Sequence, residues 1–216
     1  MDDQILTLSN RGHTANDTSR AASLIQEKKI RLGLQMMTGL PGDNGKQSIE
    51  TAHQIAALSP DFVRIYPTVV LSKSPLARSF KKGDYNPMSL EESVKLVAKI
   101  YSIFKEKNIP VIRMGLQVSD GLEDHGSILA GPYHPAFGHM VFSEIFLEKI
   151  KRQLRNEKDT IGRHLILHVH SKSVSKIRGL NNQNITTLKK MLQLESILVL
   201  ADDSIPEDQL TVDIND

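Results

Sequence analysis

A glycine-rich turn, GLPGDNG at residues 39–45, follows an apolar run and precedes a helix-like segment. Backbone N–H groups at such a place can bind an anion, because they point away from the start of the helix. The turn matches neither G-x-G-x-x-G nor the P-loop pattern, since no Lys-Ser/Thr pair follows its last glycine and Pro41 has no N–H to donate. By itself the pattern favours a tight turn over a phosphate site.

Two arginines, Arg64 and Arg113, fall inside apolar runs near the ends of predicted strands. An unpaired charge is costly there, so each arginine should have a partner or face a polar cavity. A structural ion pair would explain either arginine alone. Their equivalent positions in two repeated units favour a shared polar pocket.

Three histidines, His164, His168 and His170, fall on one predicted strand, and the last two share a face because side chains alternate with a period of two. Such a pair can bind a metal. No further acidic or histidine ligand recurs at a suitable spacing, and the alternation with Leu and Val is equally typical of a half-exposed strand. We therefore predict no metal site. We also predict no catalytic residue, since no G-x-S-x-G turn supports Ser-His-Asp catalysis.

The most basic local stretch is SKIRG at residues 175–179, followed by Asn184, Lys189 and Lys190. It could contact phosphate, although a charge cluster of this size is more often a solvated face. One alternative reading therefore makes the chain an RNA- or protein-binding module, with the segment from about Glu123 onward as the docking region.

The composition excludes several classes of site. Of 216 residues, 39% are hydrophobic and 24% charged, and the net charge is +2, which is typical of a globular protein. The chain has no cysteine, so it can form no disulfide, thiolate nucleophile, zinc-cysteine site or cysteine-bound iron–sulfur cluster. We find no leader pattern and no apolar run of about 20 residues. The expectation is a soluble cytoplasmic protein without a membrane partner.

Helix-then-strand units must position these residues. Helical patterns start at Thr14, before Ile49 and at the capping box of Ser89 and Glu92, and each leads into an apolar run. The predicted strands lie within residues 31–43, at 62–70 and at 110–116, and residues 75–82 could form a short helix. Polar or glycine-rich residues close each run, which is typical of an α/β layer that works at the carboxyl ends of its strands.

The rest of the chain is predicted to be a small α+β extension. An irregular stretch at residues 117–138 separates it from the first part, and a helix follows at about 140–155. Strands are predicted at 163–170 and 197–200, helices at 173–178 and 184–192, and an edge strand at 210–214 in an otherwise frayed tail. The domain prediction is therefore a half barrel at 1–118, a linker at 119–138 and the extension at 139–216.

Several motifs, taken in order, resemble the later half of a radical SAM domain. The resemblance is to bacterial proteins similar to the radical SAM part of the elongator catalytic subunit, often grouped with oxygen-independent coproporphyrinogen III oxidase. It rests on NRGH (10–13), LQMMTGLPG (34–42), RIYPTVV (64–70), KGDY (82–85), GPYHPAFG (131–138) and SKIRG (175–179). The fold class that it implies is α/β, a partial radical SAM-type parallel β/α barrel followed by the small α+β extension.

The resemblance implies a set of cofactor contacts. The family places SAM across the carboxyl ends of the barrel strands, which puts Arg11 at the SAM carboxylate and Gln35 at a polar SAM-facing position. Gly39, Leu40 and Pro41 correspond to the turn on the adenine side. Tyr66 lies on the next strand.

The departure from the family is equally informative. The family signature, Cys-x-x-x-Cys-x-x-Cys, binds a 4Fe-4S cluster, and this chain has no cysteine. We therefore expect a C-terminal fragment of a radical SAM enzyme that is inactive alone, with SAM and the cluster bound only in its parent protein. Its expected partner is the missing N-terminal half of the barrel or a second copy. The alternatives are an RNA- or protein-binding module and an inactive α/β scaffold that dimerises through its open edge.

Overall fold

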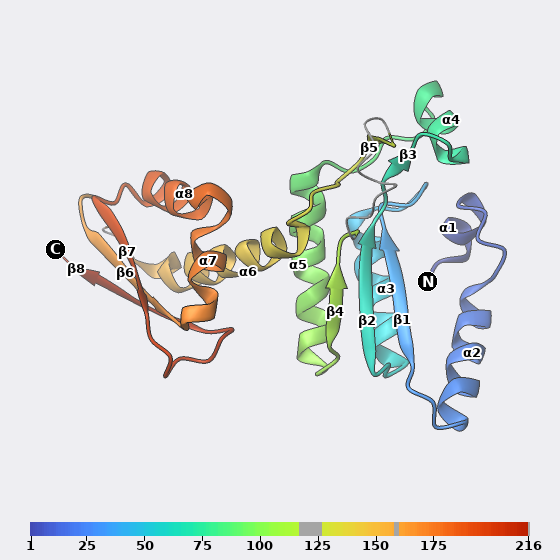
Figure 1. The fold of residues 1–216 in the computed structure, drawn as a ribbon, viewed down its shortest axis with the longest axis horizontal. Coiled ribbons are helices and arrows are strands. Elements are labelled where there is room, and N and C mark those ends of the chain that lie inside the picture. Colours follow the sequence, from blue (N-terminus) through green and yellow to red (C-terminus); the bar gives the residue numbers. More distant parts are fainter. Residues whose placement is uncertain (117–126, 158–159, 216) are drawn as a thin grey trace. The chain divides into compact units, whose positions relative to one another are not determined.

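The computed structural model describes residues 1–116, 127–157 and 160–215 of the chain. These residues form two compact units, Met1–Gly138 and His139–Asp216, which are treated separately below (Figure 1). Residues 117–126, which include the first part of the linker predicted at 119–138, lie outside the described residues. No described helix has both the length and the apolar character needed to cross a membrane.

The first unit is built on a parallel sheet of strands β1 (Gly33–Thr38), β2 (Phe62–Pro67) and β4 (Val111–Met114), in the order β1-β2-β4. The mixed α/β class with parallel strands is as predicted. No barrel closes among the described residues.

The described part of the first unit contains five helices besides the start of the helix at residue 137, and their starts follow from local sequence. They are α1 (Asp3–Leu8), α2 (Ala15–Glu27), α3 (Gly45–Ala57), α4 (Pro75–Lys82) and α5 (Leu90–Glu106). The capping box of Ser89 and Glu92 is present at α5, and Thr14 and Asp17 form another at α2. Reciprocal side-chain and backbone hydrogen bonds of this kind satisfy N–H groups that a helix start leaves without partners.

Helices α3 and α5 lie behind the sheet in Figure 1, and the apolar side chains of the strands are buried on alternate positions. Met36, Val63 and Ile65 are at most 4% exposed, whereas Gln35 and Arg64 on the opposite positions are exposed. Because strand side chains alternate between faces, the sheet has one face in the core and one polar face.

The predicted second strand, residues 62–70, is wrong in extent. Strand β2 ends at Pro67, and a separate strand β3 (Val70–Leu71) pairs antiparallel with β5 (Ile128–Ala130). Proline has no N–H for a ladder and so ends a central strand. Strand β5 also lies inside the stretch that the sequence predicted to be irregular.

The second unit contains a mixed sheet of strands β6 (His164–Val169), β7 (Ser196–Ala201) and β8 (Leu210–Asn215), in the order β7-β6-β8. Strand β6 is parallel to β7 and antiparallel to β8. Helix α6 (Phe137–Gln153) leads into this unit, and α7 (Val174–Arg178) and α8 (Gln183–Leu192) connect β6 to β7. Short 3₁₀ helices lie at Leu154–Asn156, Ser171–Ser173 and Leu180–Asn182.

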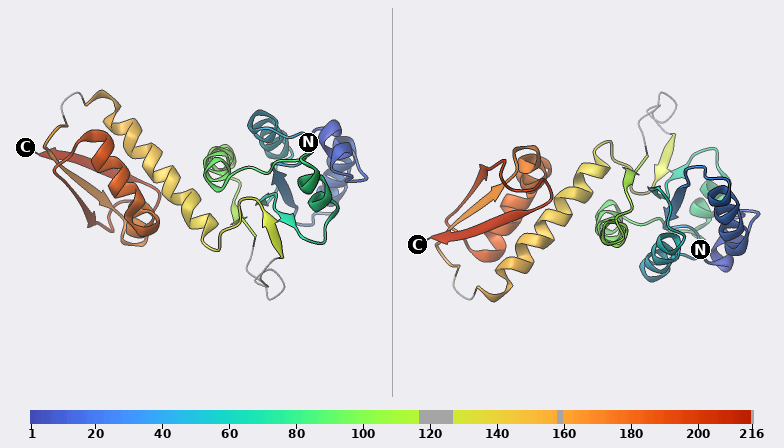
Figure 2. Two further views of the ribbon diagram at one scale, coloured as in Figure 1. Left: turned by 90° about the horizontal axis from the view of Figure 1, so that it is seen from above. Right: turned by 90° about the horizontal axis from the view of Figure 1, so that it is seen from below.

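The three helices of this unit lie on one side of its sheet (Figure 2). Their shared core contains Phe146, Leu167, Ile177 and Leu188, all at most 3% exposed. The edge strand predicted at residues 210–214 is confirmed as β8. Leu210 is buried, and Val212 and Ile214 pack against the same core, which holds β8 in register along β6.

Candidate functional site

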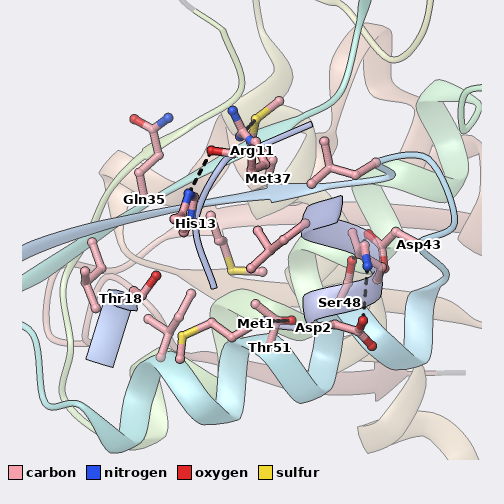
Figure 3. Close-up of a pocket in the computed structure, with 16 residues that line it drawn as sticks. Met1, Asp2, Arg11, His13, Thr18, Gln35, Met37, Asp43, Ser48 and Thr51 are labelled. Carbon is pink, nitrogen blue, oxygen red and sulfur yellow. Dashed lines mark hydrogen bonds between the residues drawn. The ribbon is translucent and has the colours of Figure 1, made fainter. Parts of the chain in front are cut away.

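A cavity of about 150 Å³ lies in the first unit beside the edge strand β1 (Figure 3). Three predicted cofactor residues line it, namely Arg11 from the turn between α1 and α2, Gln35 from β1 and Leu40 from the turn after β1. Further lining residues include Ile5, His13, Thr18, Met37, Asp43, Ser48 and Thr51. The fold therefore brings together three residues that the sequence keeps apart.

Arg11 contributes a cationic side chain to this cavity. Its side chain is exposed, and one guanidinium nitrogen contacts the sulfur of Met37. No carboxylate lies within 4.0 Å of Arg11 among the described residues. The backbone carbonyl of Arg11 lies 3.0 Å from the ring nitrogen Nδ1 of His13, which helps to fix the turn. The guanidinium can thus accept an anionic ligand without first giving up an ion pair.

Gln35, Arg64 and Arg113 form a polar row across the open face of the sheet. Gln35 is the register partner of Arg64, and Arg64 is that of Arg113. All three side chains are exposed, and within the described ranges neither arginine has a carboxylate in ion-pair distance. Arg64 lies 5.8 Å from the ring centroid of Phe62. The structural ion pairs considered for Arg64 and Arg113 are therefore not found. The two arginines instead share one polar face of the sheet.

The turn after β1 is held by side chains at both of its ends. Asp43 Oδ2 accepts hydrogen bonds from the Gly39 N–H at 2.8 Å and from Ser48 Oγ at 2.6 Å. Tyr85 donates its hydroxyl proton to the Gly39 carbonyl at 2.6 Å. Gly39 has φ of 72°, a left-handed conformation that suits glycine. The Gly39 N–H already donates to Asp43, so it is not available to an anion. The interpretation as a tight turn therefore describes Gly39 better than an anion site does.

Two polar groups around this turn, the Tyr85 hydroxyl and the Asp43 carboxylate, are affected by burial. Burial, with a smaller effect of the Asp43 charge, raises the pKa of Tyr85 to about 12. The second carboxylate oxygen of Asp43, Oδ1, is buried and has no hydrogen-bond partner among the described residues. A buried acceptor without a donor is costly, so Oδ1 is a place where a ligand hydroxyl or amine would be stabilised.

A second cavity, of about 210 Å³, lies on the other side of the turn and is lined by Gly39, Leu40 and Pro41 together with Asp43 and Tyr85. Leu40 therefore lines both cavities, and Tyr66 lines neither. Tyr66 is half-buried and is the register partner of Met37, which lines the first cavity.

The sequence analysis did not predict Asp43, Ser48 or Tyr85 as residues of the site. Asp43 carried a signal, because an acidic residue that closes a glycine-rich turn often binds the turn's own N–H groups. Tyr85 lies in the KGDY motif, but the motif does not indicate its contact with Gly39, which is 46 residues away in the chain.

The residues present do not fit an iron–sulfur cluster. The sequence has no cysteine, and the described residues contain no group of three or more His, Asp or Glu side chains that could hold a metal. In the second unit, His168 Nε2 lies 3.1 Å from Asp213 Oδ2, and His170 Nδ1 lies 3.5 Å from Asp203 Oδ1.

The residues present do fit one side of SAM. They offer a free guanidinium, a polar amide, a buried acceptor and an apolar Leu40 surface around one cavity. At about 150 Å³ the cavity is smaller than the roughly 300 Å³ at which ligand sites begin. It can therefore enclose only part of such a ligand.

Comparison with known proteins gives a consistent set of relatives. Residues 60–146 match the family model of the Radical_SAM C-terminal domain. A tRNA uridine(34) acetyltransferase of Methanocaldococcus jannaschii is 30% identical over 103 residues, which are 46% of this chain and 19% of that protein. Human Elongator complex protein 3 is 26% identical over 121 residues, 50% of this chain and 22% of that protein.

A solved structure agrees with the sequence relatives. The archaeal Methanocaldococcus infernus Elp3 with an N-terminal deletion superposes with a TM-score of 0.56 at 25% identity, over 69% of this chain and 34% of that one. The chain thus spans only about a fifth to a third of the length of these relatives. Residues 60–146 thus match the Radical_SAM C-terminal domain, and the chain is similar to part of the elongator-type proteins, as its motifs predicted.

Proposed function

We propose that the Met1–Gly138 unit forms one wall of the SAM site of a radical SAM protein. The observation that supports this is the cavity that unites Arg11, Gln35 and Leu40, three of the six residues that the family motifs predicted as cofactor contacts. In such proteins SAM, bound beside an iron–sulfur cluster, supplies radical chemistry. The role of this chain is to bind and orient the cofactor.

Each residue has a distinct part in this proposal. The Arg11 guanidinium would bind the SAM carboxylate through charge-assisted hydrogen bonds, and the Gln35 amide would bind a second polar group. Leu40 would contact the adenine, while Gly39 and Pro41 would shape the turn that presents Leu40. Tyr66 would contact only a ligand that extends from the cavity along the open face of the sheet.

The cluster must come from residues outside this sequence, because no cysteine is present. We therefore propose that these 216 residues perform no radical chemistry alone and act with a cysteine-bearing barrel segment. A second copy of this chain could cover the open sheet face, but it could not supply the cysteines.

The substrate proposal follows the names of the relatives. Since these include tRNA uridine(34) acetyltransferases, a tRNA is the first substrate to test. The reported relatives give no support to a coproporphyrinogen III oxidase-like reaction, and we do not propose it. We also do not propose acetyl transfer, because the similarity covers only 19% of the first relative.

Titration of SAM into the chain, followed by saturation-transfer NMR, tests the proposed wall. Weak binding is expected, because the wall provides only part of a pocket. Arg11→Gln should weaken it about tenfold or more, since a hydrogen bond to a charged group contributes about 1.5–3 kcal/mol. Arg31→Gln is the matched control, because Arg31 is another exposed arginine next to β1 but does not line the cavity.

Two results would contradict the proposal. One is the absence of any saturation transfer to SAM at millimolar concentration. The other is an equal loss of binding in the Arg11→Gln and Arg31→Gln variants, which would indicate attraction by net charge rather than a defined contact.

A further inference from the structure

Charge is strongly segregated along the second unit. Residues 171–194 contain five basic residues and no acidic one, namely Lys172, Lys176, Arg178, Lys189 and Lys190. Residues 195–216 contain seven acidic residues and no basic one, namely Glu195, Asp202, Asp203, Glu207, Asp208, Asp213 and Asp216. The cations of this segment are therefore gathered on α7, α8 and the residues next to them.

Only some of these cations are neutralised within the protein. Lys172 Nζ lies 2.7 Å from Glu207 Oε1, and Lys176 Nζ lies 5.4 Å from the ring centroid of Phe142. Arg178, Lys189 and Lys190 are exposed, and across the residues that the structure describes no carboxylate is within 4.0 Å of them. These three side chains remain available to an external anion.

The turn between α7 and α8 has a backbone that glycine and asparagine make possible. Gly179 has φ of 72° and ψ of 174°, a region that is almost exclusive to glycine. A Cβ there would lie 3.0 Å from the side chain of the buried Asn184. Asn181 and Asn182 follow with φ of 52° and 59°, left-handed values that asparagine tolerates. Both asparagines are exposed, so the turn presents two amide side chains to solvent.

Strand β7 has one edge to which no other strand pairs among the described residues. It lies at the edge of the β7-β6-β8 sheet and contacts both α7 and α8 (Figure 1). Its sequence, SILVLA, has no charge, proline or glycine to block pairing. An edge of this kind exposes N–H and C=O groups that can hydrogen-bond to a partner.

We propose that the Gly179–Asn182 turn, the exposed cations of α7 and α8 and the edge of β7 form a binding site for single-stranded nucleic acid. The basic side chains and the turn would bind the phosphates, and the edge of β7 would hydrogen-bond to unpaired bases. The negative charge of the ligand follows from the cations without carboxylates. Its single-stranded form follows from the β7 edge, because only unpaired bases leave their Watson–Crick edges free to hydrogen-bond with backbone groups.

The order of these elements resembles that of a known fold that binds single-stranded nucleic acid. Strand β6 is followed by helix α7, then by a turn that begins with glycine, and then by helix α8 and strand β7. KH domains clamp the backbone of four nucleotides with a GXXG loop between two helices. Here the four residues are Gly179, Leu180, Asn181 and Asn182, and Asn182 takes the left-handed conformation that the second glycine would otherwise provide.

Only some side chains of α8 are exposed, which defines the variants to use. Asn184 and Leu188 are buried, whereas Gln183 and Lys190 are exposed and lie seven residues apart, on one side of the helix. Lys190→Gln therefore removes a charge without disturbing the core. The double substitution Asn181→Asp and Asn182→Asp places two carboxylates on the turn, at backbone angles that aspartate also tolerates.

The test is fluorescence anisotropy of the full 216-residue chain with a labelled 12-nucleotide single-stranded RNA at about 50–200 mM salt. Affinity should fall as salt rises. Asn181→Asp/Asn182→Asp should weaken binding at least tenfold, and Lys190→Gln should lower the salt slope by about 0.7, the value for one phosphate contact on a single strand. The double variant Asn10→Asp/Asn108→Asp is the control, because it adds the same charge at exposed left-handed positions of the first unit and should bind normally.

Further measurements distinguish RNA, DNA and a second copy of the chain as the molecule that binds this surface. Equal binding of single-stranded DNA supports a site that contacts phosphates and bases only, and a preference for RNA supports an added contact to the 2′-hydroxyl. The proposal is overturned if a duplex binds as well as the single strand, or if the turn variants, shown to be folded by circular dichroism, bind like the unmodified chain. A dimer in sedimentation that binds no RNA would also overturn it, because a second copy would then occupy β7. None of these measurements depends on SAM.

Discussion

Replacing Tyr85 with phenylalanine removes one hydroxyl from the support of the proposed SAM wall. That hydroxyl donates to the Gly39 carbonyl at 2.6 Å, and Tyr85 is only 8% exposed. Tyr85→Phe leaves the carbonyl without this donor and keeps the ring, so the expected loss is about 1–3 kcal/mol of unfolding free energy. With a urea m-value of about 2 kcal/mol per molar, the unfolding midpoint should fall by roughly 0.5–1.5 M.

The same variant changes the pH dependence of stability. Burial raises the pKa of Tyr85 from 10.0 to about 12, so the native state keeps a proton that the unfolded chain releases above pH 10. The stability from this group is therefore complete below pH 10 and is lost as pH rises to 12, by about 2–3 kcal/mol in total. Tyr85→Phe should remove this part of the decrease in unfolding free energy between pH 10 and pH 12.

Urea unfolding at pH 7 and at several values between pH 9 and pH 11.5 measures both effects. Tyr66→Phe is the control, because the described structure records no hydrogen bond from that hydroxyl. The reasoning is refuted if Tyr85→Phe stays within 0.5 kcal/mol of the unmodified protein at pH 7, or if its alkaline slope is unchanged.

Two further predictions concern the packing of the first unit and the missing cluster. Gly115→Ala should cost about 2–4 kcal/mol in urea unfolding, because φ is +81° and the new Cβ would lie 2.8 Å from Phe137 Cβ. Gly12→Ala, with φ of +68° and no atom within 4 Å, should cost only about 1 kcal/mol, and equal costs would refute the role of the contact. Anaerobic reconstitution of the chain with iron and sulfide should leave no bound cluster after desalting, since the sequence has no cysteine. Retained iron and sulfide with a visible absorbance band would contradict that expectation.

Local patterns predicted most of the helices and strands correctly. The Ser89 and Glu92 pair marked the start of α5 because a capping box needs only residues within one turn. The alternation of Leu165, Leu167 and Val169 predicted the buried face of β6, since all three are fully buried. Strand β5 was missed because three residues with no repeating pattern become a strand only by pairing with β3.

The sequence by itself determined the absence of cysteine ligands, the α/β class and the family motifs, because each depends on residue type or on short spacing. Only the tertiary structure decided which residues meet. It aligned Arg64 with Arg113 across two strands, placed Tyr85 on Gly39, and put Arg11 and Leu40, but not Tyr66, around one cavity. It also brought the α7 and α8 helices, which flank the Gly179–Asn182 turn, into contact with β7. Such contacts depend on how helices and strands pack over long separations, which propensity and periodicity do not encode.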